Sequence, residues 1–316
     1  MNVALCLMLY GAAVATFGPP VLRKLTRRGV APRLGVLAWL VAIAGALGAW
    51  VLAAALLVIE FAALWRHPGD ALRECYSVLS MPAHIHGGFV TQAATFGIAA
   101  LVTVGVAAVS THAVRVALRL RRRTAEHGRA VRMVGRRVPG VGAVVLDSTE
   151  PQAYCVAGRP DTIVITSAAV EALTRDQLTA VLAHERAHLR GRHAALSGML
   201  RGMATTLPGV RLLTEGATEI GRLLEMCADD RAASKHGAEP LLGGLLALVG
   251  AGAAVPAGAL CAASTAVLDR AERLVEPVGP MRRATNRTAL VGVIAATVIG
   301  LLEIAVGILF CSTLIS

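Results

Sequence analysis

The sequence predicts an α-helical integral membrane protein that also carries a folded domain of mixed α and β structure. Two properties of the 316-residue chain lead to this fold class. Hydrophobic residues make up 55% of the chain, and the mean hydropathy of +0.64 is higher than a water-soluble globule tolerates. The apolar residues are also concentrated in four long runs, and a more polar stretch, residues 113–286, separates the last two.

Four segments are predicted to cross the membrane, at residues 2–18, 35–64, 88–112 and 288–312. At about 1.5 Å per helical residue each can cross roughly 30 Å of hydrocarbon, although the first does so only barely. That first segment has no Lys or Arg before Arg23, whereas a secretory signal begins with basic residues, so we interpret it as a span. The predicted domains are a membrane domain (1–112), a second domain (113–286) and a C-terminal transmembrane helix (287–316).

The basic residues orient these spans. The net charge is +11, and Arg residues are frequent in the 19–34 loop, after the third span and before the fourth, but sparse in the 65–87 loop. Cytoplasmic loops carry an excess of Lys and Arg. We therefore expect both termini to be extracytoplasmic and residues 113–286 to be cytoplasmic. The run Arg121–Arg123 fits anionic lipid better than nucleic acid, so no direct nucleic-acid binding is expected.

The cytoplasmic stretch is long enough to bury its own core. Short strands are predicted at Ala143–Leu146, Ala153–Ala157 and Thr162–Thr166, and the last two should form a hairpin. Thr174 and Gln177 have the spacing of a capping box, so a helix should begin there. Further helices are expected near residues 212–234, 239–250 and 261–275.

The helix that begins at Thr174 contains His184-Glu185-Arg186-Ala187-His188. Its two His residues, four positions apart, project from one helix face about 6 Å apart along the axis. Both imidazoles can therefore reach one Zn²⁺ at about 2.0–2.1 Å. Glu185 can then take a proton from the water at the fourth position of the metal and pass it to a leaving amine. This arrangement predicts a zinc-dependent metalloendopeptidase.

A catalytic zinc needs a third protein ligand. Another group of zinc proteases has a His at the position of Ala194, and His193 misses that position by one residue. Glu225 is the preferred ligand among the acids on the predicted 212–234 helix, which also include Glu215 and Glu219. The reason is Asp229, which follows four residues later on the same helix face. An Asp in that position can accept the free N–H of a ligand His and hold its ring.

The segments Ala183-His-Glu-Arg-Ala-His188 and Glu225-x-x-x-Asp229 together resemble the gluzincin-type membrane peptidases. Two branches are similar, the BlaR/MecR antirepressor peptidases and the heat-shock membrane proteases of the HtpX type. The spacing of 37 residues from His188 to Glu225, with three spans before the domain and one after it, is closer to BlaR/MecR. The resemblance implies zinc ligands at His184, His188 and Glu225, with Glu185 as the base. It also implies a mainly α (α+β) zincin-like protease domain.

The resemblance carries expectations about substrate and trigger. Antibiotic-sensing members of that branch have an extracellular penicillin-binding domain after the last span, whereas the sequence ends at Ser316, so we expect no such sensor. The expected function is cleavage of a cytoplasmic protein substrate, a repressor-type regulator of transcription. The alternatives are an HtpX-like quality-control protease and, from another class, a catalytically inactive membrane signalling scaffold. An intact Glu185 argues against the scaffold.

In zincins an edge strand pairs with extended substrate by β-augmentation. The sequence leaves two candidates for that strand, Ala153–Ala157 and Thr162–Thr166.

Overall fold

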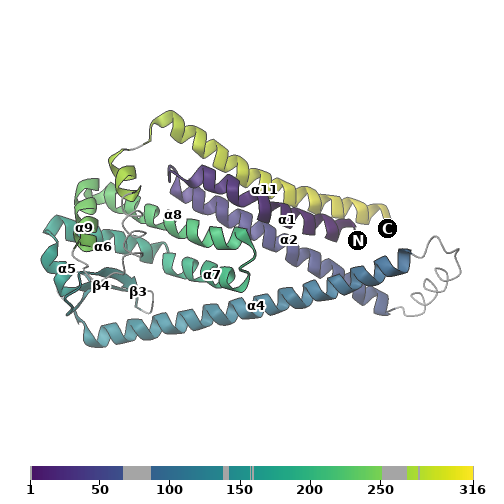
Figure 1. The fold of residues 1–316 in the computed structure, drawn as a ribbon, viewed down its shortest axis with the longest axis horizontal. Coiled ribbons are helices and arrows are strands. Elements are labelled where there is room, and N and C mark those ends of the chain that lie inside the picture. Colours follow the sequence, from purple (N-terminus) through teal and green to yellow (C-terminus); the bar gives the residue numbers. More distant parts are fainter. Residues whose placement is uncertain are drawn as a thin grey trace.

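The computed structural model describes residues 2–66, 87–137, 142–156, 158, 160–250, 269–276 and 278–315. Long helices form a bundle at one end of the molecule, and shorter helices with a small sheet form a domain at the other end (Figure 1). Both chain termini lie at the end of the bundle that is far from this domain (Figure 1). The two ends of the chain thus lie at the same end of the bundle, while the side of the membrane on which they lie stays a prediction.

Three helices of the bundle can cross a membrane. They are α1 (Asn2–Thr26), α2 (Pro32–Arg66) and α11 (Pro280–Ile315). Their apolar stretches, which are long enough to span a bilayer, are Val3–Thr26, Pro32–Ile59 and Pro280–Ile304. The first, second and fourth predicted spans therefore coincide with helices of this kind.

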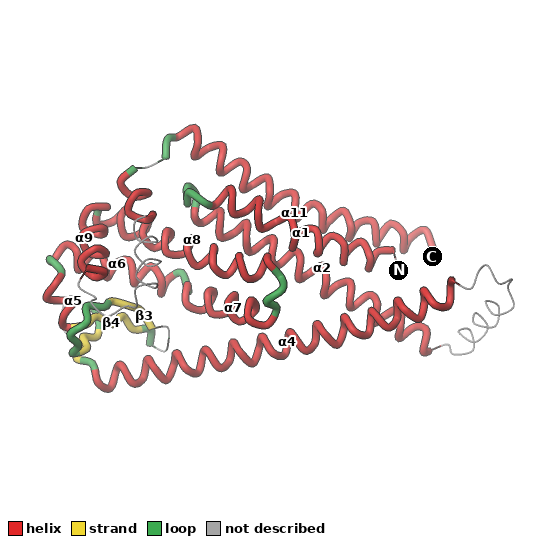
Figure 2. The backbone as a smooth tube through the Cα atoms, in the orientation of Figure 1, coloured by secondary structure: helices red, strands yellow, loops and turns green. Residues whose placement is uncertain are grey.

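The predicted third span, 88–112, lies on α4 (Gly87–Val134), a single helix of 48 residues. This helix continues from the end of the bundle along the whole length of the folded domain (Figure 2). Its first part is not among the three apolar helices found in the described chain, and many of its side chains lie outside the described part. The four-span count therefore stays a prediction. The predicted boundaries at residues 112 and 286 both fall inside continuous helices, α4 and α11.

The sheet of the domain has four strands in the order β1-β2-β4-β3. Their bounds are Arg136–Arg137 for β1, Val144–Leu146 for β2, Ala153–Val156 for β3 and Thr162–Thr166 for β4. β4 is central, since it pairs parallel with β2 and antiparallel with β3, and the β3–β4 pairing is the predicted hairpin. Every residue of β4 is buried. A strand covered on both faces suits the Ile-Val-Ile run of β4.

In the described part of the chain the domain also contains the helices α5 (Ser167–Ala172), α6 (Arg175–Arg190), α7 (His193–Thr206), α8 (Arg211–His236) and α9 (Ala238–Gly250). The capping box at the start of α6 is present, with Thr174 and Gln177 each bonding the backbone N–H of the other. Helix α7 was not predicted. Of the predicted 261–275 helix, residues 269–275 are helical and the earlier ones lie outside the described residues.

Helix α8 joins the domain to the bundle, because it packs against both α1 and α2. The shared core includes Leu212, Ile220 and Leu223 of α8, which lie with Trp39 and Ile43 of α2. At Gly216 a Cβ atom would lie 3.0 Å from the side chain of Ile43, so glycine permits the close approach of the two helices. The helix that carries Glu225 and Asp229 is thereby anchored to two candidate spans.

Candidate metal centre

Side chains from α6 and α8 converge on one point. The Nε2 atoms of His184 and His188 are 3.1 Å apart. Glu225 of α8 places Oε2 at 3.5 Å from Nε2 of His184 and Oε1 at 3.5 Å from Nε2 of His188. The three side chains form a group whose ligand atoms all lie within 4.8 Å of one another.

The spacing of these atoms suits a tetrahedral zinc ion. Ligand bonds of about 2.0–2.1 Å place neighbouring ligand atoms about 3.3–3.4 Å apart. The two His nitrogens are 3.1 Å apart, and each lies 3.5 Å from a different oxygen of Glu225, so these distances lie on either side of that value. A set of two imidazoles and one carboxylate also suits Zn²⁺ better than Mg²⁺ or Ca²⁺, which prefer oxygen ligands. The residues present therefore fit the metal.

Behind His184 lies Asp229, a fully buried carboxylate one turn beyond Glu225. Its Oδ1 is 3.1 Å from Nδ1 of His184, a close contact although it is not aligned as a regular hydrogen bond. Burial acts to lower the pKa of His184, but Asp229 and Glu225 outweigh it and raise that pKa to about 9. Asp229 therefore interacts with the ring nitrogen that faces away from the other two ligand atoms, as the sequence predicted for a carboxylate that holds a ligand His.

Behind His188 lies His193, whose Nδ1 is 2.8 Å from Nδ1 of His188. Burial, together with the nearby His188, lowers the pKa of His193 to about 4, so its ring is neutral and can accept an N–H from His188. That leaves Nε2 of His188 free for a metal. The turn that brings the two rings together has Arg192 in the left-handed conformation, with φ of 51°. Gly191 leaves room for the ring, since a Cβ there would lie 2.2 Å from Nε2 of His193.

Glu185 is buried on α6 and faces the sheet. Its carboxylate lies near the thiol of Cys155 on β3. Burial raises the pKa of Glu185, while burial and the nearby Glu185 raise the pKa of Cys155 to about 12. Cys155 is therefore a protonated thiol beside Glu185, a proximity that the sequence did not indicate.

The structure distinguishes the two strands that the sequence left open. β4 is paired on both sides, whereas β3 pairs with β4 alone among the described strands. Side chains alternate along β3, so Ala153 and Cys155 pack toward α6 while Tyr154 and Val156 pack toward α4. The edge strand beside Glu185 is therefore β3.

The other acids of α8 lie elsewhere. Glu219 is 2.9 Å from the guanidinium of Arg222, and Glu215 is 2.8 Å from that of Arg211. Neither carboxylate is part of the metal-ligating group. Of the three acids considered on this helix, α8 therefore turns only Glu225 toward the two His residues.

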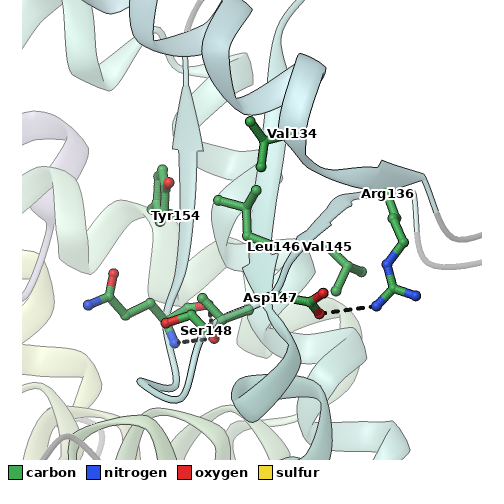
Figure 3. A pocket seen from close by; sticks show the side chains of 9 residues that line it. Val134, Arg136, Val145, Leu146, Asp147, Ser148 and Tyr154 are labelled. Atoms are coloured by element: carbon green, nitrogen blue, oxygen red, sulfur yellow. Dashed lines mark hydrogen bonds and ion pairs between the residues drawn. The ribbon is translucent and has the colours of Figure 1, made fainter.

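A cavity of about 410 Å³ is lined by residues such as Val134 of α4, Leu146 of β2 and Tyr154 of β3 (Figure 3). An ion pair of 3.1 Å between Arg136 and Asp147 lies at its rim (Figure 3). No member of the metal-ligating group lines it. The cavity is thus separate from the candidate metal centre.

Residues 117–239 match peptidase family M48. The matched stretch begins within α4 and ends just beyond α8, so it contains the whole metal-ligating group. The match supports a membrane metallopeptidase of the M48 type, a family that is generally zinc-dependent, but not the BlaR/MecR subtype that the spacing had favoured. No curated protein and no solved structure matches the chain.

Proposed function

We propose that the protein is a zinc-dependent membrane endopeptidase and that the group of His184, His188 and Glu225 is its metal site. The observation that supports this most is that the two His Nε2 atoms lie 3.1 Å apart and each lies 3.5 Å from an oxygen of Glu225, beside a buried Glu on the helix of the two His residues. The M48 match indicates protease activity in the same segment. A bound zinc ion would lower the pKa of water and polarise a peptide carbonyl.

The proposed roles of the side chains follow from their contacts. His184 and His188 offer Nε2 to the metal, while Asp229 and His193 lie against the opposite nitrogens and hold the two rings. Glu185 takes a proton from the attacking water and delivers it to the leaving amine. The protonated thiol of Cys155 lies beside the Glu185 carboxylate, between the helix and the sheet.

The substrate is proposed to be an extended segment of protein that pairs with the edge of β3 on which no described strand lies. Backbone pairing with a sheet edge provides affinity that is largely independent of sequence. A peptide added at β3 would run past Cys155 and therefore past Glu185, which lies beside Cys155. This arrangement supports endopeptidase activity, because an extended substrate can continue past the site in both directions.

The test is cleavage by the purified full-length protein in detergent, with zinc content measured on the same samples. Glu185→Gln should keep the zinc but lose cleavage, because Gln has nearly the same shape and accepts no proton. The matched control is Glu171→Gln on α5, an exposed Glu of the same domain, which should cleave normally. Normal cleavage by Glu185→Gln would refute the assignment.

The site is proposed to face the cytoplasm, on the charge asymmetry of the loops. Two substrate classes follow from the resemblance: a repressor-type regulator, and membrane proteins removed by HtpX-like quality control. The packing of α8 against α1 and α2 favours the second class, because it ties the site to the membrane helices. Fragments and transcripts compared between wild type and a Glu185→Gln strain separate the two. A single stabilised regulator with a defined set of silenced genes would favour the repressor.

A further inference from the structure

A partly buried arginine outside the predicted site lies next to the metal-ligating group. Arg270, in the helical segment 269–275, bonds Asp229 through two nitrogens, with Nε 2.7 Å from Oδ2 and Nη2 2.6 Å from Oδ1. The side chains of Arg270 and Asp229 are 11% and 0% exposed. Two parallel bonds from one guanidinium to one carboxylate fix both distance and orientation.

The third nitrogen of the same guanidinium faces the metal-ligating group. Nη1 of Arg270 is 3.5 Å from Oε2 of Glu225, the oxygen that also lies 3.5 Å from Nε2 of His184. One planar cation thus contacts both the carboxylate behind His184 and the carboxylate offered to the metal. We propose that Arg270 is a positioning residue of the metal centre, which holds Asp229 against His184 and aims Glu225. The inference rests on the proposed function, since it assigns a role within the same site.

The charge of Arg270 and its positioning role predict opposite effects on zinc affinity when Arg270 is lost. A positive charge close to a divalent cation opposes its binding, so on charge alone the loss of Arg270 would tighten zinc binding. Without its partner, however, the buried carboxylate of Asp229 would be left unpaired, which is costly enough to make it turn or take up a proton. His184 would then lose the group that orients it. Losing such an outer partner typically weakens metal binding by roughly 10–100-fold, so positioning should decide the sign.

The same segment supplies a matched control. Arg273, one turn after Arg270, is 13% exposed and pairs with Asp230 at 2.7 Å. It also bonds the carbonyl oxygens of Met226, at 3.1 Å, and Gly29, at 3.5 Å. It resembles Arg270 in burial and in its ion pair with α8, yet its contacts are with Asp230 and with two backbone carbonyls rather than with the metal-ligating group.

The experiment measures zinc affinity of the full-length protein in detergent by competition with a chelator of known affinity, together with thermal unfolding. Arg270→Lys should bind zinc at least roughly tenfold more weakly, because Lys keeps the charge but lacks the planar fork. Arg273→Lys should bind zinc as wild type does, whatever it does to the unfolding temperature. In an Asp229→Asn background Arg270→Lys should weaken zinc binding less than it does alone, because its interaction with the Asp229 carboxylate is already lost and only the contact with Glu225 remains.

Wild-type affinity in Arg270→Lys would overturn the inference. So would an equal loss in Arg273→Lys, or a full additional loss in the Asp229→Asn background. If Arg270→Lys does not fold, Arg270→Gln, which is neutral and can still donate to a carboxylate, takes its place with the same expectation. A wild-type chain that binds no zinc would refute the proposed function itself, and normal wild-type binding with unaffected Arg270 variants would refute only the inference.

Discussion

The contact between His188 and His193 depends on the absence of a side chain at Gly191. A Cβ atom at this position would lie 2.2 Å from Nε2 and 2.4 Å from Cδ2 of His193. Non-bonded heavy atoms pack at about 3.5–4.0 Å, so Gly191→Ala must push the His193 ring away by more than about 1 Å. The Nδ1 to Nδ1 contact, now 2.8 Å, would then exceed hydrogen-bonding distance.

Considered by its backbone conformation alone, Gly191→Ala should stabilise the fold rather than disturb it. Gly191 has φ of −78° and ψ of −5°, a right-handed conformation that Ala adopts easily. On conformational grounds alone the substitution would stabilise the fold by roughly 0.5–1 kcal/mol. We expect instead a loss of zinc affinity of roughly tenfold, or about 1.4 kcal/mol, from the displaced partner of His188. The fold can therefore become more stable while the metal centre becomes weaker.

The assay is chelator competition together with thermal unfolding of the metal-free protein. Gly221→Ala on α8 is the matched control, because no atom lies within 4 Å of an added Cβ there. In a His193→Ala background, Gly191→Ala should have no further effect on zinc affinity. Unchanged zinc affinity in Gly191→Ala alone would refute the role given to His193.

Three other predictions concern the ligands, the metal and the topology. Glu225→Ala should lose zinc, whereas Glu219→Ala should retain it, because, of these two acids, only Glu225 faces the two His residues. Zinc analysis of the purified variants tests this, and loss of zinc in Glu219→Ala would contradict the ligand assignment. Chelation should abolish peptide cleavage and added Zn²⁺ should restore it, so activity that survives complete removal of the metal would exclude a zinc mechanism. A reporter fused at Gly191 should be active only in the cytoplasm and one fused after Ser316 only outside it, and the reverse pattern would overturn the topology.

The local part of the site could be predicted because helix geometry repeats at short range. The four-residue spacing of His184 and His188, like that of Glu225 and Asp229, puts each pair on one helix face whatever the rest of the chain does. The capping box at Thr174 likewise depends only on residues three positions apart. Long apolar runs indicate membrane helices for a similar reason, since their length alone must match the bilayer.

The rest depended on contacts between distant parts of the chain. Arg270 lies 41 residues from Asp229, in a segment with no recognisable motif, so no pattern in the sequence pairs the two. The sequence did not assign a role to His193, because the contact of His193 with His188 depends on a left-handed turn at Arg192. The choice of β3 over β4 required the strand order, which hydrophobic alternation does not specify.

For this protein, the sequence by itself determined the membrane helices that recur in the structure and which side chains of α6 and of α8 share a face. Only the tertiary structure decided that the two helices cross where Glu225 meets His184 and His188, and that α8 lies against α1 and α2. It also decided which cation pairs with the buried Asp229. The physical reason is that a helix face follows from backbone hydrogen bonds between neighbours, whereas a buried charge finds its partner only when the whole core has packed around it.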